Sequence, residues 1–156
     1  MKRKATSAVI RFAALLLVMV LLLPVGARTA LAEAPQTRAS DYLNSYSAYV
    51  YPAANGKIQV WFNVTGTGYI ECIGALSIRI YESKDGSNWT WCTTFLHENN
   101  PGMLSYNDNY HSGHVDYQGV VGRYYRAYVC IWGGGLEVGD ARYFYTSAKK
   151  AVQTPS

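Results

Sequence analysis

The sequence is poor in cysteine and in charge. Three cysteines permit one disulfide at most and leave one thiol over. Charged residues make up 15% of the chain, and five of its fourteen basic residues lie within the first 32 positions. From residue 33 onward, nine Lys and Arg oppose ten Asp and Glu, which gives a net charge of −1. This balance argues against nucleic acid and anionic membranes as partners, because both attract proteins through an excess of positive charge.

Sequence signals for catalysis and for repeat architectures are also missing. No internal period of the solenoid or propeller kind is visible, and no helical period follows residue 32. There is no Gly-x-Ser-x-Gly motif and no signature of an activated cysteine. Four acidic residues are candidates for a glycosidase pair, but nothing in the sequence sets two of them at the required separation: Glu71, Glu82, Asp85 and Glu98. We therefore expect no catalytic residue, no cofactor and no enzyme activity.

The first 32 residues have the order of a cleavable secretory signal. A basic segment at residues 1–4 precedes an apolar stretch over residues 8–25, and Ala30-Leu31-Ala32 matches the Ala-x-Ala cleavage pattern. Arg11 interrupts the apolar run, and about 20 apolar residues are needed to span a bilayer. We expect residues 1–32 to be removed and the protein to be secreted without a transmembrane anchor. A retained membrane anchor is the alternative.

The remainder of the chain has a length that suits one domain. We expect a flexible leader over residues 33–43, a folded domain over 44–148 and a polar tail over 149–156. Leucine is scarce after residue 32, whereas the chain contains 14 tyrosines. Aromatic residues suit pleated surfaces, so this composition favours strands.

The clearest strand signal is a strict alternation over residues 57–65. Ile58, Val60, Phe62 and Val64 share one face, while Trp61 lies on the other. We expect this strand to end at Gly66-Thr67-Gly68. Six further strands are expected near residues 46–51, 76–82 (with Leu76, Ile78 and Ile80 inward), 89–95, 114–118, 124–132 (with Tyr125, Ala127, Val129 and Ile131 inward) and 141–147.

The turn signals between these strands complete the fold prediction. Asp85-Gly86 predicts a hairpin between strands 76–82 and 89–95, and a long polar connection is expected over residues 97–109. Seven short antiparallel strands predict an all-β, two-sheet sandwich.

Several short motifs of turn and strand residues follow one another along residues 44–147: Asn55-Gly56-Lys57-Ile58, Ile73-Gly74, residues 78–83, Asp85-Gly86, Asn88-Trp89, Tyr117-Gln118-Gly119, and Gly122 with residues 124–127. In these motifs the chain is similar to a family of small secreted proteins of Gram-positive bacteria, known only as a domain of unknown function. The strand order also resembles immunoglobulin and fibronectin type III sandwiches. That resemblance places Tyr125 near their corner tyrosine, whose hydroxyl ties down a loop. It implies no catalytic residues.

Two of the three cysteines are candidates for a disulfide. If strands 76–82 and 124–131 are antiparallel neighbours, Cys72 lies near Cys130. Face parity opposes this pair unless a bulge at Gly74 moves Cys72 to the matching face. We predict a Cys72–Cys130 disulfide, with three free buried cysteines as the alternative; the fate of Cys92 stays open.

A second cluster has the residue types of a metal site: His111, His114, Asp108 and Asp116. On a strand, however, an odd separation sends the two imidazoles to opposite faces. No cysteine or third histidine is nearby to complete a tetrahedral set. We expect solvated loop residues here and no metal.

Strand parity also exposes two arginines and three tyrosines on one face: Arg79, Tyr81, Tyr124, Arg126 and Tyr128. Both residue types are enriched at binding hot spots, although they are also favourable cross-strand neighbours on any exposed sheet. We predict a non-enzymatic binding or envelope-associated module whose partner is a cell-wall glycan or a surface protein. A small secreted toxin and a glycan-active enzyme are the alternatives. A contiguous exposed aromatic patch favours binding, and a carboxylate-lined cleft favours the enzyme.

Overall fold

The computed structural model describes residues 40–135 and 137–154. The predicted signal peptide, residues 1–32, and residues 33–39 of the predicted leader lie outside the described residues. Every regular element within the described residues is a strand or a short 3-10 helix. The same residues contain no helix with the length and apolarity needed to cross a membrane. The all-β prediction is confirmed.

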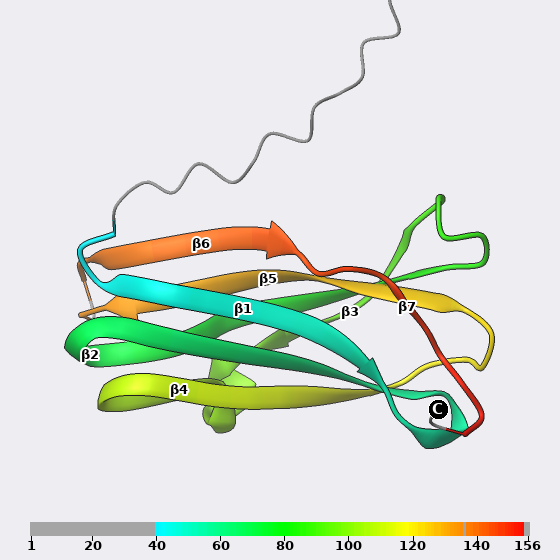
Figure 1. The fold of residues 1–156 in the computed structure, drawn as a ribbon, viewed down its shortest axis with the longest axis horizontal. Coiled ribbons are helices and arrows are strands. Elements are labelled where there is room, and N and C mark those ends of the chain that lie inside the picture. Colours follow the sequence, from blue (N-terminus) through cyan, green and yellow to red (C-terminus); the bar gives the residue numbers. More distant parts are fainter. Residues whose placement is uncertain (1–39, 136, 155–156) are drawn as a thin grey trace, which may run out of the picture. The chain divides into compact units, whose positions relative to one another are not determined.

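Seven strands form one antiparallel sheet that curls on itself (Figure 1). They are β1 (Leu43–Pro52), β2 (Lys57–Ser83), β3 (Thr90–Leu96), β4 (Leu104–Gln118), β5 (Tyr124–Gly134), β6 (Gly139–Tyr145) and β7 (Lys149–Lys150). Three 3-10 helices join them, η1 (Ala54–Gly56), η2 (His97–Asn99) and η3 (Pro101–Met103). The strand order is β1-β2-β5-β6, with β3 and β4 also paired to β2 and β7 paired to β5.

The long strand β2 runs through both parts of the sheet. Residues 57–65 pair with β1 and β4, whereas residues 70–83 pair with β5, β3 and the start of β4. Between these parts the register to β4 shifts, so that Asn109 alone lies between the partners of Thr65 and Ile70, while Gly66 still pairs with Leu43 of β1. A Cβ on Gly66 would come within 2.5 Å of Ile70 Cδ1, so glycine permits this tight bend. The predicted strand end at Gly66-Thr67-Gly68 is therefore wrong, because the strand bends there and continues.

The core lies between the two parts of the curled sheet. The inward residues predicted for strand 57–65 are all fully buried, whereas Trp61 is partly exposed: Ile58, Val60, Phe62 and Val64. They share one hydrophobic cluster with the inward residues of β5, as predicted: Tyr125, Ala127, Val129 and Ile131. Leu76 is the exception, because a register shift between Ala75 and Ser77 displaces it and Ala75 is buried instead.

The ends of the domain and its longest connection differ from the sequence expectations. Leu43 is buried within β1, and β7 with the buried Ala151 follows β6, so the folded part exceeds residues 44–148. The connection predicted over residues 97–109 contains η2, η3 and the first six residues of β4. The hairpin predicted from Asp85-Gly86 is confirmed, since β2 pairs with β3 directly across this turn.

The structure contradicts the predicted Cys72–Cys130 disulfide, because the three described cysteines are all free. β5 pairs Cys130 with Ser77, whereas Cys72 pairs with Gly134. Four residues of β5 thus separate the two positions, roughly 13 Å along a strand, and a disulfide needs Cα atoms about 4.4–6.8 Å apart. The prediction failed because β2 and β5 extend past the assumed strand ends. The register shift lies after Ala75 rather than at Gly74.

Candidate binding face

The five residues predicted for a binding face come together on the outer side of β2 and β5. Antiparallel pairing sets Arg79 opposite Tyr128 and Tyr81 opposite Arg126, and Tyr124 lies opposite Ser83. The alternate positions of both strands are buried in the core. Because side chains alternate along a strand, the five candidates point outward together.

Four aromatic residues that sequence reasoning did not assign extend this face: Trp89, Trp91, Tyr143 and Tyr145. Trp91 of β3 pairs with Tyr81, and Tyr145 of β6 pairs with Tyr128. Trp91, Tyr143 and Tyr145 are 59%, 60% and 50% exposed. We call these four residues and the five predicted ones the aromatic face. The predicted strand 141–147 was the only signal for Tyr143 and Tyr145, and its place beside β5 was not predicted.

The tyrosine rings of the aromatic face touch across neighbouring strands. The ring centroids of Tyr128 and Tyr145 are 4.6 Å apart, and Tyr143 lies 6.0 Å from Tyr128. Tyr81 lies 6.0 Å from Tyr145. Paired strands are about 4.8 Å apart, so these rings form one contiguous apolar surface over β2, β5 and β6.

Arg126 occupies the centre of the aromatic face. Its Cζ lies 4.3 Å from the ring centroid of Trp89 and 4.4 Å from that of Tyr145, so the guanidinium is held by cation–π contacts to both rings. Its Nε is buried and has no hydrogen-bond partner among the described residues. The ion pairs within those residues include neither Arg126 nor Arg79. Aromatic rings, rather than a carboxylate, therefore position this charge.

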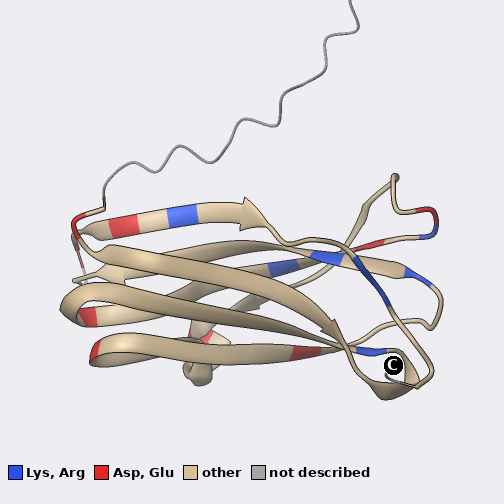
Figure 2. Cartoon of the chain, viewed as in Figure 1, with Lys and Arg blue, Asp and Glu red and all other residues tan. Residues whose placement is uncertain are grey.

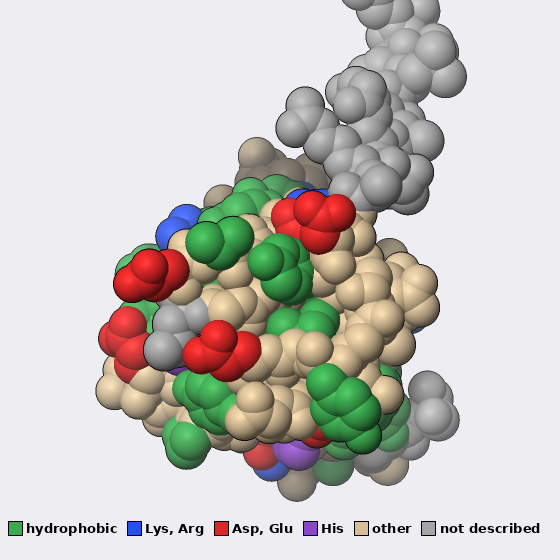
Figure 3. All heavy atoms as spheres, turned by 90° about the vertical axis from the view of Figure 1, so that its left-hand side faces the viewer, with side chains coloured by type: hydrophobic (Ala, Val, Ile, Leu, Met, Phe, Trp, Pro, Cys, Tyr) green, Lys and Arg blue, Asp and Glu red, His purple; other side chains and the backbone are tan. Residues whose placement is uncertain are grey.

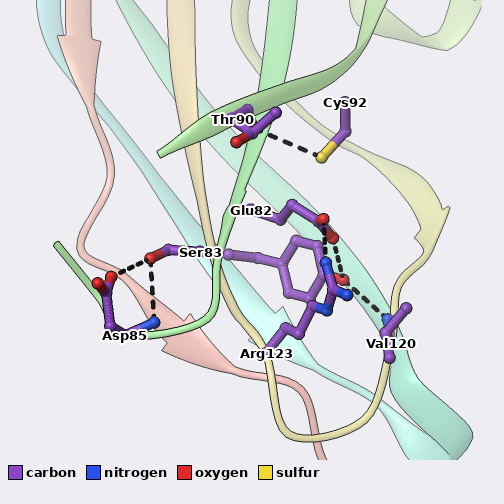
Figure 4. A network of polar contacts seen from close by, with 8 residues as sticks. Glu82, Ser83, Asp85, Thr90, Cys92, Val120 and Arg123 are labelled. Carbon is purple, nitrogen blue, oxygen red and sulfur yellow. Dashed lines mark hydrogen bonds and ion pairs between the residues drawn. The ribbon is translucent and has the colours of Figure 1, made fainter. Parts of the chain in front are cut away.

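A tight turn fixes the segment that leads to Trp89 (Figure 4). The Asp85 carboxylate accepts hydrogen bonds from the amides of Ser87 and Asn88, both at 2.8 Å, and from the Asn88 side chain at 2.7 Å. The Ser83 hydroxyl donates to it at 2.8 Å and accepts the Gly86 N–H at 2.9 Å. The backbone N–H groups of Asn88 and Ser87, followed by these side chains, hold the pKa of Asp85 well below its usual range. The Asp85 carboxylate therefore keeps these hydrogen bonds well into the acidic range.

Tyr125 is fully buried and anchors the neighbouring loop from the core side. Its hydroxyl accepts the Val120 N–H at 2.8 Å and donates to Glu82 Oε2 at 3.1 Å. Arg123 pairs with the other oxygen of Glu82. Burial and the bond to Glu82 raise the pKa of Tyr125 against the lowering effect of the Val120 amide. The Tyr125 hydroxyl thus ties the loop at Val120 to the end of β2.

The four acidic residues considered for a glycosidase pair either lie far apart or already accept hydrogen bonds from other residues. Glu82 and Asp85 line a pocket of about 230 Å³, but both accept the hydrogen bonds described above. Glu98 lies exposed in η2. Glu71 and Glu137 line a pocket of about 540 Å³ at the opposite end of the domain, where Figure 3 shows acidic side chains around the surface.

The two histidines of the predicted cluster point to opposite faces, as expected for a strand. The His111 ring lies 5.5 Å from that of buried Phe62, whereas His114 stacks on Trp61 at 4.3 Å. Both belong to β4 rather than to a loop. Among the described residues no three His, Cys, Asp or Glu side chains are grouped to hold a metal ion.

No protein-family model and no curated protein matches this chain. Among solved structures, the chain is similar to a family 76 glycoside hydrolase from a bovine Bacteroides thetaiotaomicron strain, with a TM-score of 0.32 and 17% sequence identity. The similarity covers 69% of this chain and 20% of the hydrolase. It is too weak to indicate a fold or a function.

Proposed function

We propose that the protein is an exported, non-enzymatic binding module whose aromatic face binds a cell-wall glycan. The contiguous ring surface over β2, β5 and β6 carries this proposal, because flat aromatic groups stack on the apolar faces of sugar rings. Arg126 at its centre supplies hydrogen-bond donors in a fixed position. Tyrosine, tryptophan and arginine are also the residues that contribute most at binding sites.

Paired tyrosine variants test this proposal. Tyr143→Ala with Tyr145→Ala should abolish retention of the purified protein by cell-envelope fractions, with an unchanged circular dichroism spectrum. Tyr49→Ala with Tyr51→Ala is the matched control, because these tyrosines of β1 are 47% and 46% exposed and lie outside the aromatic face. Equal retention of the two double variants, or no retention of the wild type, would refute a binding role for this face.

The same assay separates a glycan from a protein partner. Periodate cleaves the vicinal diols of sugars, so treatment of the envelope fraction should abolish binding, whereas protease treatment should leave it intact. Loss of binding after protease alone would identify a surface protein and reject the glycan. In that case the Tyr143/Tyr145 double variant should still lose retention, because the aromatic face would bind the surface protein instead of a glycan.

We also propose that residues 1–32 are removed during export. The basic, apolar and small-residue order of that segment supports this proposal. N-terminal sequencing of the protein from culture supernatant should begin at Glu33 or within a few positions of it. A cell-bound protein that begins near Met1 would contradict export by cleavage.

We further propose that the curled sheet is a variant of the immunoglobulin and fibronectin type III sandwich, and that the chain is related to the Gram-positive family it resembles. In this interpretation β2 serves as two sandwich strands joined by the bend at residues 66–69. The single core between the two parts of the sheet and the Tyr125 contact to Val120 support it. An experimental structure with continuous hydrogen bonds between β1 and β6 would instead establish a closed barrel.

A further inference from the structure

The aromatic face carries positive charge without an acidic neighbour on the same surface. Arg79 and Arg126 occupy diagonal positions on paired strands, about 7–8 Å apart between Cα atoms. Lys150 of β7 lies with its Nζ 5.5 Å from the Tyr124 ring and adds a third cation at the edge. The described outward positions of β2 from Ser77 onward, β3, β5 and β6 contain no Asp or Glu.

The carboxylates closest in sequence to this face are occupied elsewhere. Glu82 belongs to the inward side of β2 and pairs with Arg123 and the Tyr125 hydroxyl. Asp85 is engaged by its own turn. Figure 2 shows acidic segments where β6 begins, where β2 bends and on β4, and basic segments on β5 and the second part of β2; further acidic segments lie at the end of β2 and in the turn after it. The aromatic face is therefore locally cationic, although the net charge after residue 32 is only −1.

We infer that the aromatic face selects acidic glycans, polymers that carry a carboxylate or phosphate group on or beside the stacked sugar ring. This inference rests on the proposed function and names its ligand class. The guanidinium fork matches the oxygens of carboxylate and phosphate groups. An anion bound between Arg79 and Arg126 would reduce the repulsion between the two guanidinium groups. It would also act as their counter-ion, since neither arginine forms an ion pair within the described residues. Because Trp89 and Tyr145 already hold Arg126, little side-chain freedom is lost when the ligand binds.

Polygalacturonate is the first probe, because its methyl ester presents the same sugar ring without charge. We expect the ester to bind at least about tenfold more weakly than the acid, the effect of losing one charge-assisted hydrogen bond. A glycosylated poly(glycerol phosphate) tests phosphate in the same titration, and binding of only one acidic polymer identifies which anion is recognised. Binding should also weaken as ionic strength rises from about 0.05 M to about 0.5 M, since salt screens exposed charges.

Charge-matched variants locate the effect on the protein. Arg79→Gln with Arg126→Gln should lower the affinity for the acidic polymer about tenfold or more. Lys57→Gln with Arg142→Gln removes the same charge away from the aromatic face, where these residues form ion pairs with Asp116 and Asp140, and should retain binding. Thermal melts of both double variants verify that they are folded.

The outcomes separate the ligand class from the binding role. Equal affinity for the acid and its ester, or full affinity of the Arg79/Arg126 variant, overturns the inference. The proposed function survives that result if the Tyr143/Tyr145 variant still loses envelope binding. Absence of binding to both acidic polymers also overturns it. Tighter binding of polyglutamate or oligothymidine than of either acidic glycan overturns it in favour of an acidic peptide or a nucleic acid.

Discussion

Truncation of Phe62 measures how strongly the buried face of β2 holds the domain together. The Phe62 side chain is 0% exposed, and its ring packs 5.5 Å from that of His111. Gly113 on the paired strand β4 leaves the space that this ring fills, since a Cβ there would come within 2.7 Å of Phe62 Cζ. Phe62→Ala therefore removes a ring for which the neighbouring backbone provides no replacement. We expect a loss of about 3–5 kcal/mol in the free energy of unfolding.

Trp61 on the opposite face provides the matched comparison. It is larger than Phe62 but partly exposed, it stacks on His114, and its indole N–H donates to Gln59 at 3.2 Å. An aromatic pair contributes about 0.5–1.5 kcal/mol beyond its buried area, and water can refill the partly exposed site of Trp61, so Trp61→Ala should cost clearly less than Phe62→Ala. Urea denaturation followed by circular dichroism gives both values without relying on tryptophan fluorescence. Equal losses, or a larger loss for Trp61→Ala, would show that the two faces of β2 are assigned wrongly.

Three further measurements test the contacts of the core and its margins. Tyr125→Phe should cost about 1–3 kcal/mol because it removes two hydrogen bonds, one to a carboxylate; a loss below about 0.5 kcal/mol in urea melts would mean that water replaces both. Burial and Cys92 raise the pKa of Tyr117 to about 12, above its unfolded value near 10. Stability should thus hold below about pH 10, fall as pH rises toward 12, and fall less in Tyr117→Phe. Burial raises the thiol pKa of Cys72, Cys92 and Cys130, and Cys72 and Cys130 are buried; without reductant, iodoacetamide should therefore label these two only after denaturation, with three thiols labelled in total, and fewer labels would reveal a disulfide.

Local alternation predicted the faces of the strands well. Residues 57–65 and the inward set of β5 could be assigned from the sequence because the pleat imposes a period of two wherever one face is buried. The Asp85-Gly86 hairpin was predictable for a similar reason, since its turn residues and both strands are adjacent in sequence. The five predicted members of the aromatic face followed from parity on two strands that proved to be neighbours.

Features that depend on long-range register could not be predicted. The glycines at 66 and 68 predicted the end of a strand. Whether the chain ends a strand there or bends and continues depends on the close approach of Gly66 to Ile70 and on pairing with β4, which are not visible in the local sequence. Residues 105–110 of β4 have no apolar alternation, because neither face of this part of the strand is buried. The error in the Cys72–Cys130 pairing has the same origin, since four residues of register decide the distance between the two thiols.

The net charge of the chain after residue 32 does not predict the local charge of the aromatic face. A net charge of −1 after residue 32 describes the field far from the domain, and long-range attraction of polyanions depends on that field. At contact distance a ligand responds to charges within a Debye length, about 8 Å at physiological ionic strength. Arg79 and Arg126 lie within that range of each other on the aromatic face, whereas Glu71 and Glu137 line the pocket at the other end of the domain. A slow encounter followed by selective contact with an acidic sugar is therefore consistent with the same composition that disfavours attraction from a distance.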